Sequence, residues 1–135
     1  MKIVRGVRVD RTRTPQEVLD ATGREQYCCD FNIVKNMPRG EGEEVEVYFV
    51  NFGCVVRHNN LEQEYAFFNL ELIDPYSLAA VNEDFPNCTH WKDSTGNWCH
   101  MIFDRWNGRR GVSVGRYEGG CDKYWWHAGR RRVVP

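Results

Sequence analysis

Two consecutive hairpin turns within residues 90–117 constrain the fold of this chain more than any other feature. The segment DSTGN (93–97) has Asp at the first turn position and Gly at the fourth, the pattern of a type I turn closed by a left-handed residue. Asn107-Gly108 forms the second turn, because both residue types accept the positive φ angles of tight hairpins. Together the turns predict an antiparallel meander in which His90 lies opposite His100, and His100 lies opposite Gly115.

These registers also assign the two faces of the meander, because side chains alternate along a strand. One face is the predicted core: Trp91, Cys99, Met101, Phe103, Val112 and Val114. The opposite face mixes imidazole, aromatic, acidic and small groups: His90, Trp98, His100, Asp104, Trp106, Ser113 and Tyr117. Trp and Tyr are enriched at interfaces, and Gly115 leaves room beside His100. We therefore expect this second face to be an exposed working surface, either a homodimer interface or a small-molecule pocket.

The rest of the chain predicts an α+β domain spanning residues 1–135. Strands are expected at 2–10 and 45–52, and a helix at 15–22 begins with the capping box TPQE. Asp30 starts a short helical turn, and Asp74-Pro75 caps and opens another helix. Residues 60–69 fit either a helix or a strand. A fourth strand at 124–128 completes a C-terminal meander running from about residue 88 to 128, packed on the helices of the middle section.

Composition supports one folded domain. Leu, Ile, Val and Phe make up 31 of the 135 residues, and the net charge is −1, which excludes whole-chain disorder. No apolar run approaches the roughly 20 residues that cross a bilayer. The start MKIVRGVRVDR lacks the apolar region of a signal peptide, so we expect a cytoplasmic protein with no membrane contact. Most of the six cysteines are expected to be reduced, buried, small apolar side chains, because small disulfide-rich scaffolds are secreted.

Charge is unevenly distributed along the chain. Residues 40–90 contain ten acidic side chains and one basic, whereas residues 91–135 contain nine basic and four acidic. We expect the two regions to neutralise each other within the fold or across a subunit interface. Nucleic-acid binding is a third hypothesis, and it requires one continuous patch formed by Arg105, Arg109, Arg110 and Arg130.

The spacing of the cysteines and histidines gives little support for metal binding or catalysis. Cys88, His90, Cys99 and His100 match no standard zinc spacing, and the register points Cys99 away from both histidines. One combination could still bind a metal: His90 and His100 together with Cys88 or Asp104. We favour a hydrogen-bonded pair of histidines over this metal site. We therefore predict no metal and no cofactor. The enzyme alternative uses His100, His90 and Asp104 as acid/base groups, because no nucleophile motif is present.

Four sequence blocks carry a resemblance: TPQEVLDATGREQY, DPYSLAAVNED, THWKDSTGNWC and YWWHAGRRR. They resemble an uncharacterised family of short bacterial hypothetical proteins, and orphan proteins carried on integron gene cassettes in environmental DNA. The resemblance implies a small, soluble accessory protein encoded on a mobile gene cassette. It implies no activity, and it transfers no catalytic residue to this chain.

Overall fold

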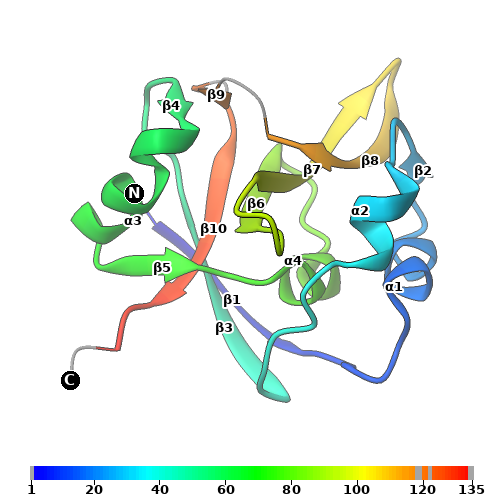
Figure 1. Ribbon diagram of the computed structural model, residues 1–135. Helices are drawn as coiled ribbons and strands as arrows, with labels where there is room; N and C mark the ends of the chain where they lie inside the picture. Colours follow the sequence, from blue (N-terminus) through cyan, green and yellow to red (C-terminus); the bar gives the residue numbers. More distant parts are fainter. Residues whose placement is uncertain (1, 118–119, 122, 134–135) are drawn as a thin grey trace.

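An eight-stranded mixed sheet forms the centre of this α+β fold (Figure 1). The computed structural model describes residues 2–117, 120–121 and 123–133. The strands are β1 (Lys2–Arg8), β2 (Glu25–Gln26), β3 (Glu44–Val50), β5 (Leu70–Leu72), β6 (Asn87–Lys92), β7 (Trp98–Trp106), β8 (Arg109–Arg116) and β10 (Trp126–Arg131). Their order in the sheet is β1-β3-β10-β6-β7-β8-β2, and β5 pairs with β10.

The predicted meander registers are confirmed. In β6–β7, His90 pairs with His100, and in β7–β8, His100 pairs with Gly115. Asn107 and Gly108 adopt φ angles of 53° and 75°, as a tight hairpin turn requires. The whole segment 97–117 contains strand and turn but no helix.

Strand β10 departs from the prediction. The sequence predicts that it extends the meander to residue 128, but it lies on the other side of β6 and pairs with β6 in parallel. Its second neighbour is β3, which it meets antiparallel. A parallel pair is reached by a long connection and not by a tight turn, so no local signal specifies it. The correction places His127 beside Cys88 in the sheet.

One face of the sheet is covered by α1 (Pro15–Ala21), α2 (Phe31–Lys35) and α4 (Pro75–Val81). Their expected caps are present: Thr14 and Glu17 form a capping box, and Asp30 and Asp74 accept backbone N–H groups of the first turn. The predicted core residues of the meander are all buried beneath these helices: Trp91, Cys99, Met101, Phe103, Val112 and Val114.

A smaller layer covers part of the opposite face. It consists of β4 (Val56–Arg57), the 3-10 turn η1 (His58–Asn60), α3 (Leu61–Phe67) and β9 (Gly120–Cys121), which pairs with β4 (Figure 1). The ambiguous segment 60–69 is therefore helical up to Phe67, and the chain then turns at Asn69, whose φ is 58°, into β5. A second core forms here: Val50, Val56, Leu61, Tyr65, Leu70, Cys88, Ile102 and Tyr117.

No helix among the described residues is long and apolar enough to span a membrane.

Candidate metal centre

The predicted working surface is only partly exposed. His90 and Tyr117 are buried, with 1% and 5% of their surface exposed, so the expectation of an open face is wrong for these two residues. Tyr117 donates its hydroxyl to the carbonyl of Val56, which fastens the β4 layer over this face. The remaining predicted residues are half-buried: Trp98, His100, Asp104, Trp106 and Ser113.

The acid/base grouping of the enzyme alternative does not assemble. Asp104 lies four residues from His100 on the same strand, which places the two about 13 Å apart at the usual rise of a strand. The Asp104 carboxylate instead accepts hydrogen bonds from the indole of Trp125, at 3.1 Å, and from the backbone N–H of Arg105. Trp106 packs edge-on against Tyr27, with ring centroids 5.2 Å apart.

The structure does bring together a cluster of rings centred on His90. The ring of Tyr117 lies 4.4 Å from that of His90, and the ring of His127 stacks on it at 5.6 Å with an interplanar angle of 20°. His100 meets His90 edge-on at 6.3 Å, and Phe52 packs against His127 at 4.7 Å. Three of the four histidines of the chain therefore meet between the sheet and the β4–α3 layer.

Within this cluster, Cys88, His90 and His127 present ligand atoms that all lie within 4.8 Å of one another. The sheet sets this arrangement, because His127 pairs with Cys88 across β10–β6 and His90 follows two residues later on the same face of β6. The Sγ atom of Cys88 is 3.6 Å from Nδ1 of His127. All three residues are almost fully buried.

Burial controls the protonation of these imidazoles. Desolvation lowers the pKa of His90 well below its usual value, and the neighbouring His127 and His100 lower it further. Desolvation alone lowers the pKa values of His127 and His100 to about 4. At neutral pH the three rings are therefore uncharged, and an uncharged imidazole has a lone pair that a metal ion can accept.

The chemistry of the group favours metal binding over covalent catalysis. One thiol and two imidazoles form a ligand set suited to zinc or copper. A Cys–His pair can also act as a nucleophile, but a nucleophile must reach its substrate, and Cys88 has no exposed surface.

Sequence reasoning found Cys88 and His90 but missed His127. The available signal was the spacing of Cys88 and His90, which places both on one face of a strand, but the third member depends on the parallel pairing of β10. The prediction that Cys99 points away from the histidines is confirmed, since Cys99 lies in the core beneath α1, α2 and α4.

Three of the four arginines that the nucleic-acid hypothesis requires lie in ion pairs, and the fourth, Arg105, is exposed. Arg109 contacts Glu25 at 2.6 Å, Arg110 contacts Asp84 at 2.7 Å, and Arg130 contacts Glu71 at 2.6 Å. Arg130 is on β10, whereas Arg109 and Arg110 are on β8, and β6 and β7 lie between these strands. The pairs of Arg110 with Asp84 and of Arg130 with Glu71 join the basic region to the acidic region 40–90, as expected, whereas Glu25 lies outside that region.

Comparison with protein families, curated proteins and solved structures finds no match for this chain. The resemblance to integron cassette proteins and self-association through the second face of the meander both stay predictions.

Proposed function

We propose that this protein binds a single transition-metal ion, with Zn²⁺ as the reference case, through Cys88, His90 and His127. The observation behind the proposal is that three buried donor atoms of two soft or borderline types converge within 4.8 Å. Three metal-binding side chains seldom converge in a core, because polar side chains are mostly found at the surface.

The spacing is close to what a metal needs. Zn–S and Zn–N bonds of about 2.3 and 2.0 Å at a tetrahedral centre separate the ligand atoms by about 3.3–3.8 Å. Cys88 Sγ and His127 Nδ1, at 3.6 Å, already lie in this range. His100 lies outside this group: its ring centre is 6.3 Å from that of His90, although its buried Nδ1 has no hydrogen-bond partner among the described residues.

The consequence for the fold is a cross-link at its centre. The parallel pairing of β10 with β6 covers only two residue pairs, Trp126 with Asn87 and His127 with Cys88. A metal held by Cys88 and His90 from β6 and His127 from β10 joins the two strands there. The proposed role of the ion is to stabilise the native state, which alone brings the three ligands together.

The experiment measures metal content and stability together. The purified, chelator-treated protein is titrated with Zn²⁺ and with Co²⁺, and stoichiometry, thermal midpoint and the cobalt absorption spectrum are recorded. We expect one ion per chain, a rise in the thermal midpoint, and a thiolate-to-cobalt charge-transfer band. Cys88→Ala should abolish all three.

Cys99→Ala is the matched control. Cys99 has the same residue type and the same full burial in the neighbouring strand, but faces the opposite core. Both variants lose the same atoms, so only Cys88→Ala should remove the response to metal. The exposed Cys28 and Cys54 are replaced by serine in every sample to eliminate surface binding. No stabilisation by either metal, or an identical response of both alanine variants, overturns the proposal.

A further inference from the structure

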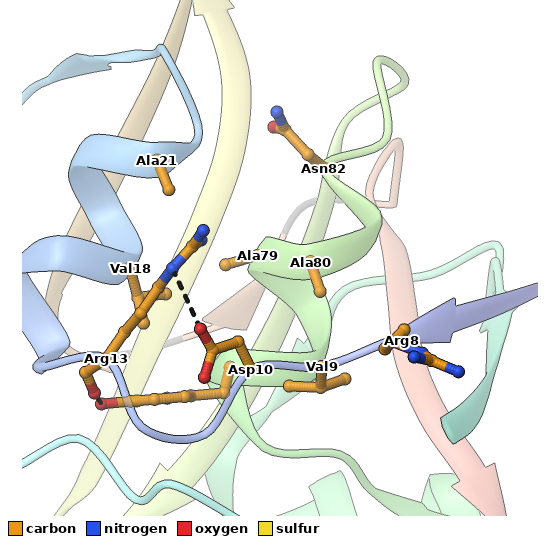
Figure 2. A pocket seen from close by; sticks show the side chains of 10 residues that line it. Arg8, Val9, Asp10, Arg13, Val18, Ala21, Ala79, Ala80 and Asn82 are labelled. Carbon is orange, nitrogen blue, oxygen red and sulfur yellow. Dashed lines mark hydrogen bonds and ion pairs between the residues drawn. The ribbon is translucent and has the colours of Figure 1, made fainter. Parts of the chain in front are cut away.

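A cavity of about 240 Å³ lies between α1, α4 and the loop that follows β1, on the side of the molecule away from the β4–α3 layer (Figure 2). Its walls have an apolar side and a polar side. The apolar side is formed by Val9, Val18, Ala21, Ala79 and Ala80, and the polar side by Arg8, Asp10, Arg13, Tyr76 and Asn82. The short alanine side chains on the two facing helices leave the space open. The cavity is large enough for about eight water-sized groups, which is the size of a small organic molecule.

Arg13 supplies a cation at this cavity. Figure 2 shows its side chain rising between α1 and α4, with Asp10 below it. The Nε edge of the guanidinium faces Asp10, at a long 3.7 Å. Its two Nη groups donate no hydrogen bond to any residue that the structure describes, although Arg is built to bind two oxygens at once. The two Nη groups of Arg13 therefore have hydrogen-bond donors available at the cavity.

Hydrogen bonds hold the backbone of the loop that carries Arg13 in place without a ligand. The backbone carbonyl of Arg13 accepts hydrogen bonds from Tyr76 at 2.6 Å and from Arg39 at 2.6 Å. Arg39 also donates to the carbonyl of Arg11, and the Arg11 guanidinium is anchored on Asp74. A fixed backbone reduces the entropy that ordering a binding site costs.

The other charged side chains that line the cavity have partners of their own. Asp10 accepts from the hydroxyl and the backbone N–H of Thr12, and these hydrogen bonds lower the pKa of its carboxyl, so it is an anion at neutral pH. This anion faces the Nε edge of Arg13, and the Nη groups point away from it (Figure 2). Arg8 is highly exposed and pairs with Glu44 at 3.2 Å. Glu17 completes the capping box of α1. Arg13 is therefore the group with unused donors toward the cavity.

We infer that this cavity binds a small monocarboxylate with an apolar body, of about eight non-hydrogen atoms, whose carboxylate pairs with the Nη groups of Arg13. A single guanidinium fork matches the two oxygens of one carboxylate. The apolar side of the cavity, formed by Val9, Val18 and the three alanines, favours an aliphatic or aromatic body on the ligand. The inference does not depend on the metal centre, which lies on the opposite face of the sheet.

The test uses hexanoate as the probe, followed by amide chemical shifts in ¹H–¹⁵N NMR. Hexanamide, neutral and of the same shape, is the matched ligand control. We expect saturable shifts at residues 9–21 and 76–82 with hexanoate, and binding by hexanamide at least tenfold weaker, because a charge-assisted hydrogen bond is lost.

Three variants then localise the site. Arg13→Gln should weaken hexanoate binding about tenfold or more, while Arg5→Gln, which changes the net charge equally on exposed β1, should leave it unchanged. Ala80→Leu adds bulk from an exposed helix position, so it fills the cavity without disturbing the core, and it should block hexanoate. Equal binding of hexanoate and hexanamide, or wild-type affinity in both Arg13→Gln and Ala80→Leu, overturns the inference.

Discussion

The guanidinium of Arg11 and the carboxylate of Asp74 lie 2.8 Å apart, although 63 positions separate them in the chain, and only about 15% of either side chain is exposed. Arg11 also donates to the backbone carbonyls of Arg39, Glu41 and Gly42. Asp74 in turn accepts from the backbone N–H of Ser77 at the start of α4. This one ion pair therefore ties three segments together: the loop after β1, the loop before β3, and α4.

Substitution of Asp74 separates its two roles. Asp74→Asn keeps an oxygen that can cap α4 but loses the charge that faces Arg11, so we expect a loss of about 1.5–3 kcal/mol in the free energy of unfolding. Asp74→Ala also loses the cap and should cost about 1 kcal/mol more. Urea denaturation of both variants measures the difference. Equal losses would show that the cap contributes nothing.

The buried histidines predict a loss of stability in mild acid for the metal-free protein. The pKa of His127 is about 4 in the fold, against about 6.5 when unfolded. Below about pH 6.5 His127 binds a proton in the unfolded chain but stays neutral in the native state. The free energy of unfolding therefore falls as the pH drops towards 4 and levels off below pH 4. His127 alone accounts for about 3 kcal/mol over this window. Chemical denaturation from pH 8 to pH 4 tests this, and His127→Gln should make the pH dependence shallower by the contribution of His127, while His90 and His100 keep theirs.

Phe103 probes the larger core. Its side chain is fully buried, and the guanidinium of Arg24 lies 4.3 Å from its ring centre. We expect Phe103→Ala to cost about 3–5 kcal/mol in unfolding free energy. His100→Ala, at a half-buried position on the other face of β7, should cost far less at pH 7. Comparable losses in urea denaturation would contradict the two-core description.

The second hairpin turn offers a backbone test. Asn107 adopts a φ of 53°, a left-handed conformation that β-branched residues reach only with strain. Asn107→Val should therefore destabilise the protein by about 1–2 kcal/mol, although the side chain is exposed. Asn107→Gly, which has no such penalty, is the control. Identical thermal midpoints for the two variants would exclude a strained turn.

Local chemistry explains which parts of the fold could be predicted from the sequence. The turn at Asn107-Gly108 and the caps at Thr14 and Asp74 each depend on residues only a few positions apart, and each is confirmed. The meander registers follow from the turns by counting. They place His90 and His100 on one face without reference to the rest of the chain.

The unpredicted parts depend on distant segments. The burial of His90 is caused by a layer about 30 residues earlier in the chain, whose helix and strand patterns overlap in residues 60–72. The position of His127 depends on a parallel pairing without a turn to specify it. A cysteine and a histidine were therefore recognisable as neighbours, but the third member of the candidate metal centre was not.

The position of β10 has a consequence for how the chain folds. This strand, residues 126–131, lies between β3 and β6 in the middle of the sheet, so the two halves of the sheet cannot join until it arrives. The β1–β3 pair and the β6–β8 meander can form earlier, because each is built from antiparallel partners. During synthesis at the ribosome, the edges of β3 and β6 that later pair with β10 stay unpaired until β10 has been made. Unpaired strand edges promote aggregation. The last step of folding is then strand insertion, a slow closure of long-range contacts.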